Sequence, residues 1–181
     1  MRIDHIAYRV KDRNKSAKFF IDAFGYKIQE EFNIEFEDNT SANCFAMTPF
    51  ENPPDEENIE LPAKSYCLMK DKELHSPPDI FVSDGDPGSI VWRWVEKNGG
   101  TGGIHHIAYE VENVEKTMEL WIENKWAEFT TIQPIESEGL VQCFTKPHPV
   151  TGVIYEFIRR LKPGFSIGNV KDLMESTEGI Q

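Results

Sequence analysis

Cysteines are scarce in this sequence, which has only three among 181 residues. Small secreted domains that depend on disulfide bonds carry a dense and usually even set, so a disulfide framework is excluded. Cys44, Cys67 and Cys143 each stand in an apolar run and are far apart in the chain. We therefore expect them to be buried, reduced thiols.

Long apolar stretches are also missing, and none approaches the roughly 20 residues that a helix needs to cross a bilayer. The chain begins directly on a strand-like pattern, without the charged and apolar regions of a signal peptide. These absences predict a cytoplasmic protein that has no membrane partner.

Basic residues are few relative to acidic ones: 19 Lys and Arg stand against 31 Asp and Glu, which gives a net charge of −12. Nucleic acids and anionic membrane surfaces bind basic patches, so both are unsuitable partners. The hydrophobic content of 39% is that of a globular protein with a core. The acidity favours solubility and indicates little else about the partners.

The most informative feature of the sequence is an internal repeat. The segment Asp4–Val10 (DHIAYRV) matches the segment His105–Val111 (HHIAYEV) without a gap, and five of the seven positions are identical. A repeat at a fixed spacing indicates that one structural unit occurs more than once. The chain is therefore predicted to contain two copies of a unit, each opening with a strand that carries a histidine.

The hydrophobic periodicity gives both copies the order strand, helix, further strands. Predicted strands span residues 2–10, 26–32, 41–48, 63–69, 79–83, 104–111, 127–133, 140–146 and 153–160. Predicted helices span residues 16–24, 88–97, 114–124 and 170–177, and an acidic, proline-rich surface loop spans 49–62. The organisation is a first module (1–87), a connecting helix and glycine-rich turn (88–102), a second module (103–160) and a C-terminal tail (161–181).

The alternation of side chains along a strand selects which histidines can meet. His5 and His106 occupy the same position in the two copies, and we expect them on corresponding faces of their strands. His105 falls with Asp4 on the opposite face. Strand alternation therefore pairs His106, and not His105, with His5.

Glu156 is the third residue of this candidate site. It shares a face of the last strand with two isoleucines, and a buried carboxylate is unfavourable unless it is paired or binds a metal. Two imidazoles and a carboxylate supply three ligands for a divalent metal and leave positions open for other ligands. The alternative is that His5 and His106 are hydrogen-bonded structural histidines.

The repeated unit, with a histidine opening each copy and a glutamate in the final strand, resembles the vicinal oxygen chelate superfamily. This superfamily includes glyoxalase I, methylmalonyl-CoA epimerase, extradiol dioxygenases and 4-hydroxyphenylpyruvate dioxygenase. The resemblance implies an α+β fold in which two βαβββ modules form a cleft from a curved mixed sheet. It also implies that His5, His106 and Glu156 are the metal ligands.

Two branches of the superfamily are similar to different parts of the chain. Residues 102–111 (GGIHHIAYEV) resemble the epimerase, whereas residues 139–147, 154–160 and 164–173 resemble the C-terminal domain of the dioxygenase. By the latter resemblance, the tail closes the pocket. Gln142 matches a glutamine that faces the substrate, Phe165 is a candidate lining residue, and Val170 replaces a pocket aromatic.

The dioxygenase resemblance implies a non-haem Fe(II)-dependent enzyme that acts on a small 2-oxo acid, or a related substrate, chelated through two adjacent oxygens. One alternative is an epimerase, isomerase or lyase that uses Co, Mn, Ni or Zn, with Glu37 or Asp38 as general acid or base. Another is a non-catalytic small-molecule-binding protein, as the resistance proteins of the superfamily are. Dimerisation is common in the superfamily, so a homodimer stays open.

Overall fold

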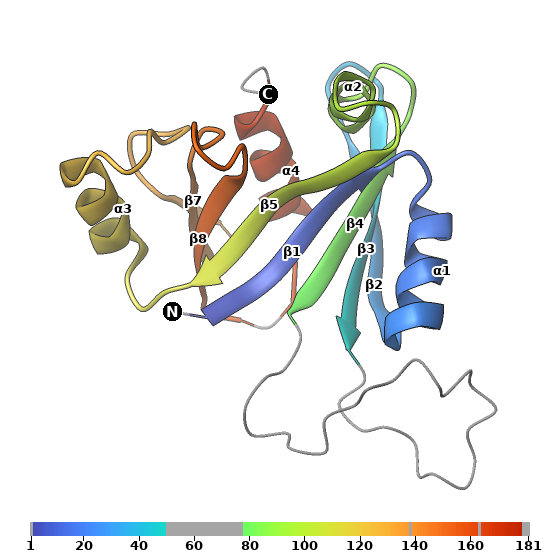
Figure 1. Ribbon diagram of the computed structural model, residues 1–181, viewed down its shortest axis with the longest axis horizontal. Helices are drawn as coiled ribbons and strands as arrows, with labels where there is room; N and C mark the ends of the chain where they lie inside the picture. Colours follow the sequence, from blue (N-terminus) through green and yellow to red (C-terminus); the bar gives the residue numbers. More distant parts are fainter. Residues whose placement is uncertain (1, 50–77, 138, 163, 179–181) are drawn as a thin grey trace, which may run out of the picture.

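The computed structural model describes residues 2–49, 78–137, 139–162 and 164–178 (Figure 1). The strands are β1 (Arg2–Val10), β2 (Tyr26–Glu35), β3 (Ser41–Pro49), β4 (Asp79–Gly85), β5 (Gly102–Glu110), β6 (Ile135–Ser137), β7 (Leu140–Phe144) and β8 (Ile154–Arg160). The helices are α1 (Arg13–Phe24), α2 (Ile90–Lys97), α3 (Val114–Glu123) and α4 (Ile167–Ser176). The predicted loop over 49–62 lies outside the described residues except for Pro49, which ends β3, and the predicted strand over 63–69 and Cys67 lie outside them entirely.

All these strands belong to one sheet in the order β2-β3-β4-β1-β5-β8-β7-β6. The order of the first half is repeated in mirror image by the second, with β1 and β5 antiparallel at the junction. Each half pairs its first and last strands in parallel, β1 with β4 and β5 with β8. The predicted α+β fold of two βαβββ units in a mixed sheet is thus confirmed.

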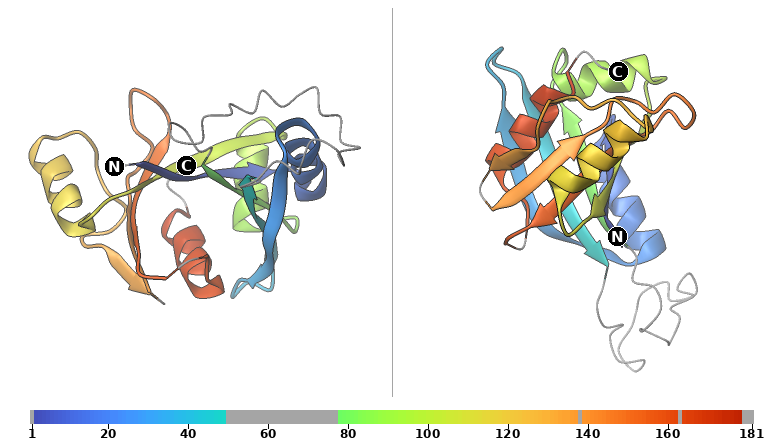
Figure 2. Two further views of the ribbon diagram at one scale, coloured as in Figure 1. Left: turned by 90° about the horizontal axis from the view of Figure 1, so that it is seen from below. Right: turned by 90° about the vertical axis from the view of Figure 1, so that its left-hand side faces the viewer.

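The sheet is curled, and α4 lies in its concave side (Figure 2). Val170 and Met174 of α4 pack into the core cluster of the first half, while Leu173 packs with Phe144 and Ile154 of the second half. The outer face is covered by α1 and α3, whose buried residues Ala17, Phe20, Val114 and Met118 pack onto the two halves of the sheet. The C-terminal helix therefore joins both halves from the inside.

Local capping explains where the helices begin and end. The Asp12 side chain accepts a hydrogen bond from the Lys15 amide at 3.0 Å, and Gly25 ends α1 in the left-handed conformation, with φ at 71°. At the C-terminus, Ser166 caps α4 by accepting from the Asn169 amide at 3.2 Å. The helix thus starts at Ile167 rather than at the predicted residue 170.

The strand predicted over residues 127–133 is wrong. This segment contributes a single bridge between Phe129 and Thr145, and the next ladder strand, β6, comes only at Ile135–Ser137. Thr131 donates to the carbonyl oxygen of Gln133 at 2.7 Å, a local bond that competes with strand pairing. Ile132 is 98% exposed, so the apolar pattern that suggested a strand does not reach the core.

The predicted burial of the thiols is confirmed for Cys44 and Cys143, neither of which is solvent-exposed. Burial raises the pKa of Cys44 well above its ordinary value and that of Cys143 to about 12. Because the thiolate is the reactive form, we expect iodoacetamide at neutral pH to label both only after the protein is denatured. Site-resolved mass spectrometry measures this, and rapid native labelling of either thiol contradicts it.

No helix among the described residues is both long enough and apolar enough to span a bilayer.

Candidate metal centre

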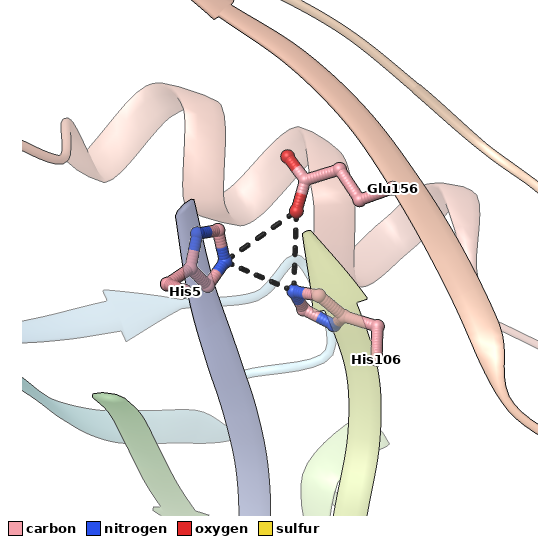
Figure 3. Close-up of side chains that lie close together, drawn as sticks. All are labelled: His5, His106 and Glu156. Atoms are coloured by element: carbon pink, nitrogen blue, oxygen red, sulfur yellow. Dashed lines mark hydrogen bonds and ion pairs between the residues drawn. The ribbon is translucent and has the colours of Figure 1, made fainter. Parts of the chain in front are cut away.

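The three predicted ligands converge in the concave side of the sheet (Figure 3). His5 Nε2 lies 3.2 Å from His106 Nε2 and 3.4 Å from Glu156 Oε2. His106 Nε2 lies 3.3 Å from the same carboxylate oxygen. The exposed fractions of His5, His106 and Glu156 are 2%, 2% and 1%. Three potential ligand atoms thus form a nearly equilateral triangle that is shielded from solvent.

Strand register brings these residues together. In the β1–β5 ladder His5 pairs with Ala108 and Ala7 pairs with His106, so the two imidazoles are diagonal neighbours on one face. In the β5–β8 ladder Ala108 pairs with Glu156. Ala7 and Ala108 are buried and fill little of this face, which leaves the space that the larger side chains occupy.

Two irregularities in the β1–β5 ladder lie beside the ligands. The register skips Asp4 in β1 and His105 in β5, each the residue before a ligand histidine. Asp4 Oδ1 lies 2.8 Å from His5 Nδ1, and His105 Nδ1 lies 2.8 Å from His106 Nδ1. A bulge redirects side chains from the alternation of a regular strand. Strand alternation correctly predicted that His5 and His106 lie together, but the predicted placement of Asp4 and His105 on the opposite face missed their contacts with these two imidazoles.

Arg160 holds the Asp4 carboxylate in place. Its Nη2 donates to Oδ1 at 2.7 Å, and its Nε donates to Oδ2 at 2.9 Å. Burial by itself raises the pKa of Asp4, but the hydrogen bonds from His5 and Arg160 outweigh it and hold this pKa well below its usual range. Asp4 is therefore ionised and can only accept. His5 Nδ1 therefore donates to Asp4, and Nε2 faces the triangle.

No Arg or Lys among the described residues forms an ion pair with Glu156, although Arg160 acts on this carboxylate at longer range. Burial lowers the pKa of His106 and outweighs the opposing effect of Glu156, so this imidazole is neutral near pH 7. Glu156 Oε2 is buried and has no hydrogen-bond partner. His5 Nε2 and Glu156 Oε2 lie 3.4 Å apart, and a cation between them would give the carboxylate oxygen the partner that it lacks.

The donor set fits a divalent metal ion. Atoms that each bond to one ion at about 2.1 Å, in octahedral to tetrahedral arrangements, are themselves about 3.0 to 3.4 Å apart. The ligand atoms of His5, His106 and Glu156 are the group among the described residues that meets the geometric requirement for a shared ion. A set of two histidines and one carboxylate with open positions is typical of non-haem iron sites.

A narrow pocket, partly open to solvent, is lined by His5, His106 and Glu156. Gln142 and Phe165, both predicted to contact a substrate, lie in its wall. The remaining lining residues are mainly apolar: Phe81, Leu140, Asn169, Val170 and Leu173. Gln142 Nε2 and Asn169 Oδ1 are buried without hydrogen-bond partners, so the pocket offers two amide groups to a bound molecule.

Asn169 was not predicted as a site residue, because the last helix was predicted to begin only at residue 170. Ser166, three residues earlier, was the signal that could have placed it in the first turn of a helix. Glu37 and Asp38, the acid or base residues of the epimerase alternative, are exposed and do not line the pocket. Asp38 instead accepts hydrogen bonds from the amide and hydroxyl of Thr40 at 3.0 and 2.6 Å.

Comparison with solved structures finds the same fold in enzymes of different activity. A mutant of 4-hydroxymandelate synthase from Streptomyces coelicolor matches with a TM-score of 0.71 at 17% identity, over 98% of this chain and 53% of that one. A methylmalonyl-CoA epimerase matches with a TM-score of 0.61 at 21% identity, over 90% and 97%. The epimerase from Mycobacterium tuberculosis gives 0.57 at 15% identity, over 90% and 89%. The chain spans about half the length of the synthase.

Comparison with curated protein sequences gives no match. The family model that describes the Glyoxalase/Bleomycin resistance protein/Dioxygenase superfamily matches residues 2–145. This range contains most of the sheet, including both histidines of the triangle. On this match, the chain belongs to the Glyoxalase/Bleomycin resistance protein/Dioxygenase superfamily.

Proposed function

We propose that the protein is a non-haem Fe(II)-dependent enzyme of the dioxygenase type, with His5, His106 and Glu156 as the metal ligands. Its substrate is a small 2-oxo acid, or a related compound that chelates the metal through two adjacent oxygens. The observation that carries this proposal is the buried Glu156 Oε2, which lacks a hydrogen-bond partner and faces two imidazole nitrogens. When bound, the ion supplies Lewis acidity and a redox centre for reaction with dioxygen.

The pocket residues have separate roles in this proposal. The Gln142 amide donates to a substrate oxygen, and the Asn169 side-chain carbonyl accepts from a substrate hydroxyl or amide group. Phe81 and Phe165 hold the apolar part of the substrate. The Phe165 ring also lies edge-on to His5, with centroids 5.0 Å apart, and so keeps water from this side of the imidazole.

Two observations favour this reaction over the epimerase alternative. The ligand set is the two-histidine, one-carboxylate combination that suits iron and dioxygen. An epimerase also needs a proton donor or acceptor beside the substrate, and Glu37 and Asp38 do not line the pocket.

The test is oxygen uptake by protein purified anaerobically without chelator and loaded with Fe(II). We expect uptake with a suitable member of a panel of 2-oxo acids, and none without substrate or after chelation. Protein loaded with Co, Mn, Ni or Zn is the control and should not consume oxygen. Oxygen-independent turnover, or proton exchange of a substrate in deuterated water under anaerobic conditions, contradicts the dioxygenase proposal and supports the epimerase alternative.

A further inference from the structure

Arg160, the last residue of β8, makes contacts in two directions. On one side its Nη2 and Nε bond the Asp4 carboxylate at 2.7 and 2.9 Å. On the other side its Nη1 donates to the carbonyl oxygen of Gly164, and its guanidinium carbon lies 4.5 Å from the centroid of the Phe165 ring. One rigid cation therefore joins β1 to the segment that leads into α4.

Both residues that Arg160 contacts in this way, Asp4 and Phe165, themselves contact the proposed ligand His5. Asp4 accepts the hydrogen bond of His5 Nδ1 at 2.8 Å and so fixes the orientation of the imidazole. Phe165 packs edge-on against the ring from a centroid distance of 5.0 Å, at an interplanar angle of 82°. Arg160 thus supports His5 through a carboxylate and through an aromatic ring.

The same segment also forms part of the pocket. Phe165 precedes α4, and Asn169, Val170 and Leu173 of α4 are lining residues. The position of α4 therefore determines the shape of the substrate pocket. The contacts of Arg160 with Gly164 and Phe165 hold the segment that precedes α4 against β8.

We propose that Arg160 is a positioning residue that couples the orientation of His5 to the seating of residues 164–176, so that metal binding and closure of the pocket favour each other. This inference rests on the proposed metal centre. Coupling between two sites is reciprocal, so an ion that fixes His5 also stabilises the seated segment. The planar guanidinium is required, because its separate N–H groups bond Asp4 and Gly164 at once.

The test uses Co²⁺ as a spectroscopic metal probe, with the full chain in every case. Arg160→Met removes the charge, and Arg160→Lys keeps the charge but loses the fork. Arg159→Met is the matched control, since Arg159 is the exposed neighbour on the same strand. The double variant Asp4→Asn/Arg160→Met removes the carboxylate that Arg160→Met alone leaves buried and unpaired, and so guards against failure to fold.

Two quantities are measured for each variant. Titration of the visible absorption of Co²⁺ gives the metal affinity and the ligand field, and hydrogen exchange with and without Co²⁺ gives the protection of the α4 amides. In the wild type and in Arg159→Met, we expect Co²⁺ to slow exchange in α4. In Arg160→Met, we expect affinity to fall about 10- to 100-fold, as for other residues that orient metal ligands.

In the metal-free protein, Arg160→Met should already exchange faster in α4, and added Co²⁺ should no longer slow it. Arg160→Lys should lie between the two, and the double variant should fold but show no protection of α4 by Co²⁺. Wild-type affinity in a folded Arg160→Met, or a loss of affinity without a change in α4, overturns the coupling alone. If the wild type itself binds no Co²⁺, the proposed metal centre fails and the coupling fails with it.

Discussion

Glu156→Gln should strongly weaken metal binding and leave the metal-free protein as stable as the parent, or more stable. Glu156 is 1% exposed, and its Oε2 lies 3.4 Å from His5 Nε2 without a hydrogen-bond partner. A buried carboxylate oxygen without a hydrogen-bond partner destabilises the folded state. Glutamine replaces the carboxylate by a neutral group of the same shape and brings an N–H that can donate to His5 Nε2.

The two effects have opposite signs. Loss of one ligand of three should lower metal affinity by about 100-fold or more, which corresponds to about 2.7 kcal/mol. The free energy of unfolding of the metal-free protein should stay equal or rise by up to about 2 kcal/mol, because replacing buried ionic groups is often neutral or stabilising. Elemental analysis and Co²⁺ titration measure the first effect, and urea unfolding in the presence of chelator measures the second.

Glu136→Gln is the matched control, since Glu136 is an exposed residue of β6, the edge strand that β7 separates from β8. It should change neither metal affinity nor stability. If Glu156→Gln binds metal within tenfold of the parent, Glu156 is not a ligand. If it loses more than about 1 kcal/mol of stability without metal, Glu156 has a structural role that the geometry does not show.

The convergence of the three ligand residues could be predicted because each depends on a short-range pattern. The duplication places His5 and His106 at equivalent positions of two strands, and the period of two assigns each to a face. Glu156 alternates with Ile154 and Ile158 along the last strand, and the structure buries all three on one side. The fold follows from the same repeat, since both units have one order of elements.

The residues that orient the ligands could not be predicted in this way. Asp4 and His105 reach the imidazoles only because the β1–β5 ladder skips both, and the register of a ladder is a property of two strands together. Arg160 bonds Asp4, a residue at the other end of the sequence, and no local pattern predicts this contact. Asn169 depends on the helix start at Ser166, which competes with the loop tendency of Gly168.

Phe157→Ala is expected to produce the largest loss of stability. Phe157 is 1% exposed and packs its ring at 4.8 Å from that of Trp121 on α3. It belongs to a buried cluster with Val114 and Met118, through which α3 covers the outer face of the sheet. Truncation of a buried phenylalanine to alanine removes about 3 to 5 kcal/mol, because apolar contacts are lost and a cavity remains.

That loss is a large fraction of the roughly 5 to 15 kcal/mol by which a domain is normally stable. Urea unfolding in the presence of chelator measures it, with Phe24→Ala as control, because Phe24 is 57% exposed and should lose less than about 1 kcal/mol. Phe157→Leu, which keeps most of the volume, should lose less than Phe157→Ala. A loss below about 1 kcal/mol for Phe157→Ala would show that this cluster does not hold α3.

Glu156 and Phe157 are consecutive residues of β8, and we expect substitutions at the first to affect metal binding and at the second to affect stability. Glu156 faces the pocket, whereas Phe157 packs under α3 on the other side of the sheet. Under conditions in which Phe157→Ala remains folded, its metal affinity should stay near that of the parent. The three proposed ligands do not belong to the buried cluster that contains Phe157, Val114 and Met118. Glu156→Gln should show the reverse, a stable protein with strongly weakened metal binding. If Phe157→Ala instead loses metal while still folded, the two faces of the sheet are coupled and the ligand geometry depends on the outer core.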